Sequence, residues 1–180
     1  MKTCCCKRIC IYLLGKNFTV SVLVSPQRGL IFYEIAEAGM TNERFIAFMT
    51  EALQERIGID NEAVVIMDNL RAHDYECESD SHTIKFLPRY SPFLNPIESV
   101  FSAVKSAIKR EISRRRIEYS HLIDAATVLQ ANKSDVRREF LADIVERHLL
   151  ETITPQLVQN CEHHALNYLD RCLNGEEIDG

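Results

Sequence analysis

The sequence lacks any long apolar run. Its longest, Ile9–Leu14 and Ala63–Met67, contain six and five residues, whereas a helix needs about 20 apolar residues to cross a bilayer. The run near the start is also shorter than the apolar part of a secretion signal, which spans about 7–15 residues. We therefore exclude a membrane-spanning protein and expect no signal peptide.

The cysteines lack the regular spacing of a disulfide framework or a zinc site. Their number is odd, and no Cys-x-x-Cys pair occurs, so a reduced intracellular compartment fits best. They are Cys4, Cys5, Cys6, Cys10, Cys77, Cys161 and Cys172. Three adjacent thiolates do not converge easily on one tetrahedral ion. We interpret residues 1–14 as a Cys-rich N-terminal segment, for which acylation is an alternative role.

The chain also lacks the positive charge of a protein whose whole surface binds nucleic acid. It has 21 Lys and Arg against 26 Asp and Glu, a formal net charge of −5, so any DNA contact must be local. A basic stretch stands out between Ser102 and Glu118. Its basic residues are Lys105, Lys109, Arg110, Arg114, Arg115 and Arg116. They fit contacts to a nucleic-acid backbone, and a solvated helix face is the alternative interpretation.

Apolar periodicity predicts strands first and helices later. Alternation and short apolar runs indicate strands, and apolar residues three or four apart indicate helices. The expected strands are Phe18–Val24, Leu30–Ile35, Ala63–Met67 and Thr83–Leu87. The expected helices begin near Thr41, Asn95, Tyr119, Asp135 and Pro155. Strands alternating with helices favour an α/β fold, followed by a helical C-terminal extension.

Two carboxylates stand at positions typical of a metal site. Asp68 ends the apolar run Ala63–Met67, and Glu98 lies in the first turn of a helix that Asn95 is placed to cap. Converging carboxylates suit Mg²⁺ or Mn²⁺. The alternative is that Asp68 is a turn residue and that Glu98 merely complements the helix dipole.

The amino-acid sequence around these two carboxylates indicates a family more specifically than their positions do. The segment Val64-Val65-Ile66-Met67-Asp68-Asn69-Leu70-Arg71-Ala72-His73 is followed by Phe86-Leu87-Pro88-Arg89-Tyr90-Ser91-Pro92-Phe93-Leu94-Asn95-Pro96-Ile97-Glu98. Together they closely resemble the DDE domain of mariner-type transposases, over residues 15–116. The resemblance implies a ribonuclease-H-like fold in which Asp68 and Glu98 are the second and third acidic residues of the catalytic set. It places Asn69, His73 and Asn95 near the metal site or in the loop that aims the helix.

One departure from this family concerns the first acidic residue. It should lie on the central strand before the hairpin, yet no Asp or Glu occurs from Met1 to Tyr33. We therefore expect an incomplete ribonuclease-H-like domain over residues 15–116, with its first strand missing or replaced, and a helical extension over residues 117–180. Without that strand, Ala63–Met67 would expose an unpaired edge, unless Lys7–Leu14 or a second chain fills the slot.

These expectations lead to two functional hypotheses. The first is a transposase-derived domain that binds DNA and whose ancestral Mg²⁺-dependent cleavage and strand transfer are impaired, with a nuclear location and a possible homodimer. The second is a catalytically inactive protein-interaction module. A sequence that lacks its beginning is a further explanation of the missing aspartate.

Overall fold

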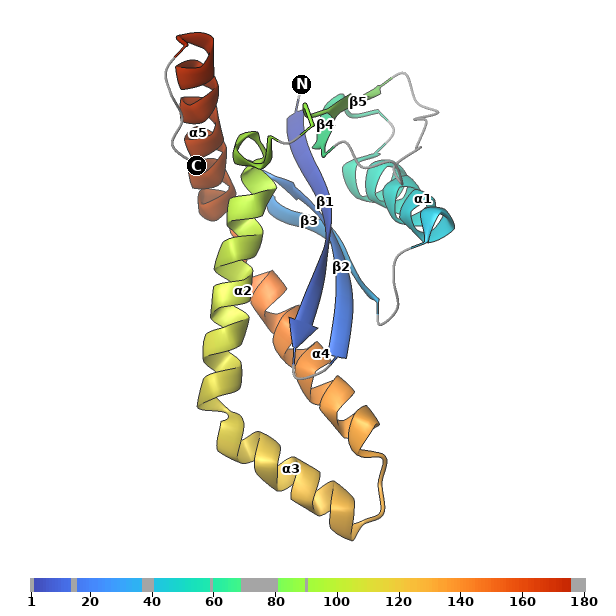
Figure 1. Ribbon diagram of the computed structural model, residues 1–180. Coiled ribbons are helices and arrows are strands. Elements are labelled where there is room, and N and C mark those ends of the chain that lie inside the picture. Colours follow the sequence, from blue (N-terminus) through green and yellow to red (C-terminus); the bar gives the residue numbers. More distant parts are fainter. Residues whose placement is uncertain are drawn as a thin grey trace.

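The computed structural model has a mixed α/β fold, in which a five-stranded sheet is flanked by helices (Figure 1). It describes residues 2–13, 16–36, 41–58, 60–68, 81–89 and 91–175, and the side chains from residue 18 onward within these ranges. The strands are β1 Lys2–Leu13, β2 Lys16–Ser25, β3 Gly29–Ala36, β4 Ala63–Met67 and β5 His82–Phe86. The helices are α1 Asn42–Glu51, α2 Pro96–Arg114, α3 Arg116–Val128, α4 Lys133–Thr152 and α5 Pro155–Leu173. Within these ranges no helix is long and apolar enough to span a membrane.

The Cys-rich start of the chain is the central strand of the sheet. The strand order is β3-β2-β1-β4-β5. β1 pairs antiparallel with β2, from Cys5 opposite Val24 to Leu13 opposite Lys16, and parallel with β4, from Lys2 opposite Ala63 to Cys5 opposite Ile66. Of the alternatives that the sequence offered, the first strand is present, because Lys2–Leu13, which includes most of the proposed segment Lys7–Leu14, fills its slot. β4 is accordingly not an edge strand, since β5 pairs with its other side.

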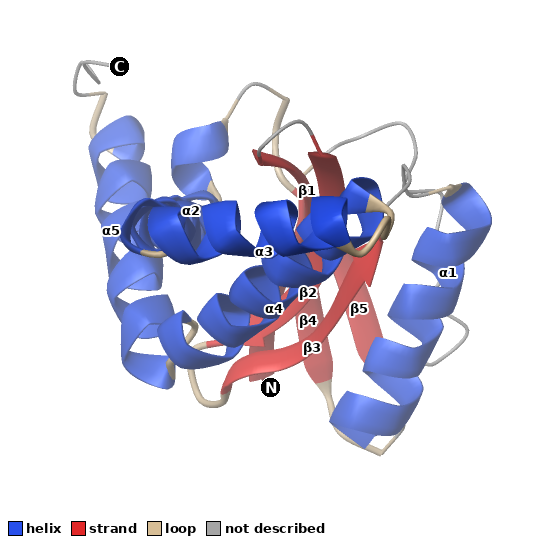
Figure 2. Cartoon of the chain, turned by 90° about the horizontal axis from the view of Figure 1, so that it is seen from below, coloured by secondary structure: helices blue, strands red, loops and turns tan. Residues whose placement is uncertain are grey.

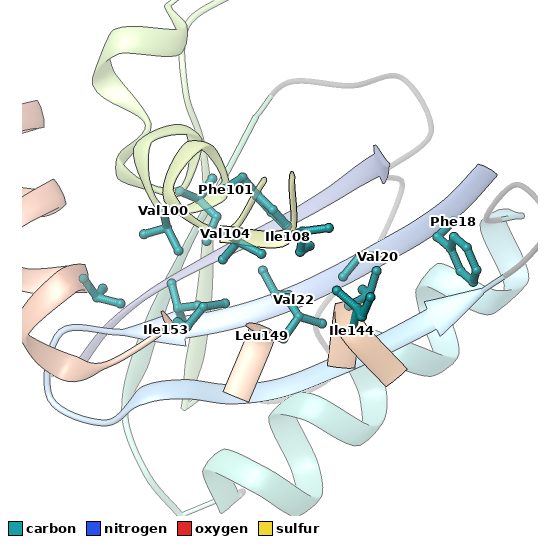
Figure 3. Packing of buried hydrophobic residues seen from close by; sticks show 14 of the residues in the cluster. Phe18, Val20, Val22, Val100, Phe101, Val104, Ile108, Ile144, Leu149 and Ile153 are labelled. Atoms are coloured by element: carbon teal, nitrogen blue, oxygen red, sulfur yellow. The ribbon is translucent and has the colours of Figure 1, made fainter. Parts of the chain in front are cut away.

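Each face of the sheet is covered by its own hydrophobic cluster. On one face, β2 residues pack against helices α2, α4 and α5. Figure 3 shows Val20 and Val22 of β2 facing side chains that include Val104, Ile144 and Leu149. On the other face, α1 and the π-helical segment Ala52–Gly58 cover Leu23 of β2 and three residues of β4, namely Ala63, Val65 and Met67. The two groups of helices lie on opposite sides of the sheet in Figure 2.

Local sequence signals explain where several helices begin. Thr41 caps α1 by accepting a hydrogen bond from the Arg44 N–H, and Thr154 caps α5 by accepting from the Leu157 N–H. Pro155 occupies the first position of α5, where the missing N–H costs nothing. α4 begins at Lys133, slightly before the predicted start near Asp135, because Asn132 caps the helix by accepting a hydrogen bond from the Ser134 N–H.

Helices α2, α3 and α4 extend past the end of the sheet and form an arm (Figure 1). An ion network holds the arm together. Arg115, between α2 and α3, bonds Glu118 at 2.6 Å and Asp143 of α4 at 3.4 Å. Arg147 of α4 bonds Asp143 at 2.6 Å and Glu111 of α2 at 3.2 Å. Each helix of the arm is therefore tied to a neighbour through charged side chains.

Candidate two-carboxylate site and basic helix

Asp68 directly follows β4, whose neighbours β1 and β5 run parallel to it. Side chains alternate along a strand, so Asp68 shares the face of Ile66, which packs against the cluster formed with α2, α4 and α5. The opposite face holds Val65 and Met67. Asp68 is half-buried, and its Oδ1 atom is inaccessible to solvent. The apolar run that predicted β4 thus also fixes the direction of its terminal carboxylate.

Glu98 lies in the first turn of α2, on the same side of the sheet. Its N–H donates to the Asn95 carbonyl at 3.1 Å, which sets the start of the helix. Its neighbours Ile97 and Val100 are fully buried in the cluster that includes Ile66. Asp68 thus follows a strand of the sheet, and Glu98 begins a helix that packs on the sheet face of Ile66.

The central strand supplies no carboxylate opposite Asp68. The parallel register pairs Cys5 with Ile66, and two further residues along each strand bring Lys7 level with Asp68. The whole of β1 contains no Asp or Glu. Within the part of the chain that the structure describes, no group of three or more His, Cys, Asp or Glu side chains forms a metal-binding cluster. The strand is present, and the first acidic residue is not.

The donor set fits one hard divalent cation. Two carboxylates with water or phosphate oxygens are an ordinary ligand set for Mg²⁺, which keeps several waters in protein sites. The buried Oδ1 atom of Asp68 offers the oxygen chemistry that this ion prefers. The set does not supply the additional carboxylate expected for a pair of ions.

Asn95 occupies the N-cap position of α2, as predicted, but its side chain does not cap the helix. It is only 3% exposed. Among the residues that the structure describes, neither its Oδ1 nor its Nδ2 atom has a hydrogen-bond partner. The expectation of a capping role is therefore wrong, and the start of α2 depends on Pro96 at its first position and on backbone hydrogen bonds.

Two predicted site residues cannot be placed. Asn69 and His73 lie outside the described residues, as does Tyr90 of the loop before α2. The rest of that loop forms a short 3₁₀ helix, Pro92–Leu94, whose Phe93 ring lies 5.9 Å from the Tyr168 ring of α5. The C-terminal helix thus supports the loop that leads to Glu98.

The basic stretch divides between two flanks of α2. At about 100° per residue, Lys105 and Lys109 lie in line with Glu98, whereas Arg110 and Arg114 lie roughly 120–160° further round the helix. Glu111 forms an ion pair with Arg147 of α4, so the flank with Arg110 and Arg114 is the one nearer α4. Lys109, Arg110 and Arg114 are exposed, and Lys105 is half-buried.

Arg115 has a structural environment. Its side chain is 24% exposed and pairs with Glu118 and Asp143. Its guanidinium carbon lies 4.7 Å from the Phe140 ring centroid. The hydrogen bond to Glu118 and the nearby carboxylates raise the pKa of Arg115 above its ordinary value. A stretch of like charges does not indicate such partners, because Asp143 and Phe140 are more than twenty positions away in the sequence.

Comparison with known proteins gives a family match and two structural likenesses. Residues 9–122 match the family described as DDE superfamily endonuclease. A chain in the cryo-EM structure of the simian T-cell lymphotropic virus intasome in complex with PP2A regulatory subunit B56 gamma is similar over 63% of this chain and 42% of its own length, with a TM-score of 0.51 and 13% identity. A chain in the crystal structure of the Mos1 strand transfer complex is similar over 91% of this chain and 54% of its own, with a TM-score of 0.47 and 13% identity.

These likenesses differ in what they establish. The chain spans about half the length of the two solved chains, and the likeness to the intasome chain shows a shared fold alone. No curated protein matches the sequence significantly. The family match covers more than half of the chain and includes β4, Asp68, Glu98 and the whole of α2. The chain therefore belongs to the DDE superfamily endonucleases.

Proposed function

We propose that this chain is a ribonuclease-H-like DDE domain that binds nucleic acid and holds one divalent cation between Asp68 and Glu98. The observation that carries the proposal is the family match over residues 9–122, which includes Asp68 directly after β4 and Glu98 in the first turn of α2. Lys105 and Lys109 support a nucleic-acid partner, because they continue the flank of α2 that begins with Glu98.

The proposed activity is phosphodiester cleavage and joining of DNA ends, in an impaired form. A bound Mg²⁺ or Mn²⁺ would polarise the phosphate and activate the attacking oxygen. Asp68 and Glu98 would hold that ion. Because β1 contributes no carboxylate near Asp68, a pair of ions would be under-neutralised at this site. We therefore propose that cation binding survives and that strand transfer by this chain is weak. A nuclear location follows from the DNA partner and belongs to the same proposal.

A Mn²⁺ titration of thermal stability tests the site. A ligand that binds only the folded state raises the melting temperature, so we expect Mn²⁺ to stabilise the wild-type protein and to have little effect on Asp68→Asn or Glu98→Gln. The matched control is Glu62→Gln, which removes an exposed carboxylate just before the first residue of β4. It should keep the wild-type response.

Two outcomes would contradict the site. Mn²⁺ could leave the folded wild-type protein unchanged, or it could stabilise the Asp68 and Glu98 variants as much as the wild type. Circular dichroism of each metal-free variant establishes that it is folded before the titration is interpreted.

The second candidate function is a non-enzymatic interaction module. The absence of a carboxylate from β1 favours it. The module would use the edge strand β5, where the Phe86 side chain is 47% exposed, because an open edge can pair with a strand of a partner. A protein that shows neither Mn²⁺ stabilisation nor salt-dependent DNA binding would favour this function over the first.

A further inference from the structure

Asn95 has a buried polar side chain, and its position at the N-cap of α2 does not explain why a polar side chain is buried there. It is only 3% exposed, and its carboxamide oxygen and nitrogen both lack a hydrogen-bond partner within the described part of the chain. A carboxamide offers two N–H donors and two acceptor sites. Buried polar groups are nearly always satisfied, and an exception calls for an explanation such as a bound water or ion.

The backbone of Asn95 does not need this side chain. Its N–H donates to the Pro92 carbonyl at 3.1 Å, and its carbonyl accepts from the Glu98 N–H at 3.1 Å. An N-cap asparagine ordinarily accepts a hydrogen bond from the second or third N–H of its helix, yet Asn95 makes no such bond. An apolar residue of similar size would satisfy the same backbone without burying orphaned polar atoms.

The position of Asn95 places it beside Glu98, one of the two residues proposed to hold the cation. An N-cap residue and the residue three positions later are neighbours on the first turn, as the capping box demonstrates. Here that later residue is Glu98. The two carboxylates leave most of the coordination sphere of a divalent cation to other oxygens. The carboxamide oxygen of Asn95 is an oxygen ligand of the required kind, buried and uncommitted.

We propose that Asn95 is a third polar group of this site, whose carboxamide oxygen binds the divalent cation held by Asp68 and Glu98, either directly or through one metal-bound water. The inference rests on the proposed function of the site. It gives Asn95 a binding role in place of the capping role expected from the sequence.

The test uses changes at Asn95 that move metal-free stability and cation affinity in opposite directions. Asn95→Leu removes the orphaned polar atoms, so the metal-free melting temperature should rise by about 3 °C or more. Its Mn²⁺ affinity should fall by about 10-fold or more. Asn95→Asp adds a buried charge, so it should lower the metal-free melting temperature, and Mn²⁺ should restore it. Free Mn²⁺ is counted by electron paramagnetic resonance with the full chain.

A second variant keeps the test informative if Asn95→Leu does not fold. Asn95→Ser retains a good N-cap residue but shortens the side chain, and it should also lose Mn²⁺ affinity. Wild-type Mn²⁺ affinity in a folded Asn95→Leu or Asn95→Ser protein would overturn the inference. If Asp68→Asn and Glu98→Gln lose Mn²⁺ binding while the Asn95 variants keep it, the proposed function stands and the role of Asn95 fails. If none of the variants alters Mn²⁺ binding, both fail.

Discussion

Gln130 and Gly29 adopt the same unusual backbone region for opposite reasons. Gln130 follows α3 with φ of 54°, and the Ala131 N–H returns to the Ala126 carbonyl at 2.9 Å. This is the helix-ending motif in which glycine is the usual residue. Gly29 has φ of 72°, and an added Cβ would lie 2.8 Å from the Ile153 carbonyl oxygen. Position 29 therefore requires glycine. At position 130, the side chain of Gln130 leaves the end of α3 strained.

Replacing Gln130 with glycine should therefore stabilise the protein. A left-handed conformation costs a residue with a Cβ roughly 1–2 kcal/mol, and the greater freedom of glycine in the unfolded chain offsets part of the gain. We expect Gln130→Gly to raise the free energy of unfolding by about 0.5–1 kcal/mol, measured by urea denaturation. The control Gln130→Ala keeps the Cβ and should change little. A less stable glycine variant would contradict this interpretation of the helix end.

At the scale of elements, α2 offers two basic flanks whose contributions to DNA binding should differ. The flank with Lys105 and Lys109 continues from Glu98, and the flank with Arg110 and Arg114 lies nearer α4. Each phosphate contact adds about 0.7–0.9 to the slope of log affinity against log salt concentration.

Neutralising the first flank should therefore weaken DNA binding and its salt dependence. Lys105→Gln combined with Lys109→Gln should lower the slope by about 1.8, measured by fluorescence anisotropy with a DNA duplex over a range of salt concentrations. Arg110→Gln combined with Arg114→Gln removes the same charge and serves as the matched control. Equal losses for the two pairs would mean that the basic stretch acts only through its total charge.

The arm should respond to acid through Asp143. The hydrogen bond from Arg147 holds the pKa of Asp143 below its ordinary value, and Arg115 adds to the effect. A carboxyl whose pKa is lower in the folded state stabilises the protein above its unfolded pKa of about 3.9. That contribution is lost as the pH falls through the folded value.

Asp143→Asn should consequently destabilise the protein at neutral pH and not in acid. The side chain of Asp143 is 61% exposed, so the loss should stay below about 1 kcal/mol. Urea denaturation between about pH 7 and pH 3 should show the wild-type and variant curves converging at the acid end. Asp124→Asn, which changes an exposed carboxylate of α3, is the control. A difference between Asp143→Asn and wild type that persists unchanged in acid would show that packing, and not charge, links the arm.

The elements that could be predicted from the sequence are those in which the element's own residues show a clear apolar pattern. The apolar run Ala63–Met67 coincides with β4, and the alternation from Phe18 to Val24 falls within β2. β1 was anticipated only as one alternative, for Lys7–Leu14, because its cysteines and basic residues show no clear alternation. Its place depends on pairing with β2 and with β4, about sixty residues away. Long-range pairing of this kind leaves little local signal.

The candidate site was predicted in the same uneven way. Asp68 and Glu98 were identified because a long motif surrounds them, and that motif lies within the residues that match the family. The orphaned carboxamide of Asn95 depends on tertiary burial, which no local pattern reports. By contrast, the two flanks of α2 follow from helical periodicity alone and could have been separated from the sequence.

At the scale of the whole molecule, the charge is distributed unevenly. The chain carries a formal net charge of −5, yet the basic residues of α2 gather along one helix that begins at Glu98. Such an arrangement directs a polyanion to one part of the surface while the remainder repels it. Any nucleic acid should therefore approach along α2.

The tip of the β2–β3 hairpin is fastened to the opposite end of the chain. The Leu30 N–H donates to the Ile153 carbonyl at 3.2 Å, and Gln159 of α5 donates to the Pro26 carbonyl at 2.8 Å. Segments joined by hydrogen bonds of this kind tend to unfold locally together. We therefore expect the hairpin and the two C-terminal helices to open as one cooperative unit. The exchange of the Leu30 amide with deuterated water would then report when α4 and α5 detach, although those helices begin a hundred residues further along the chain.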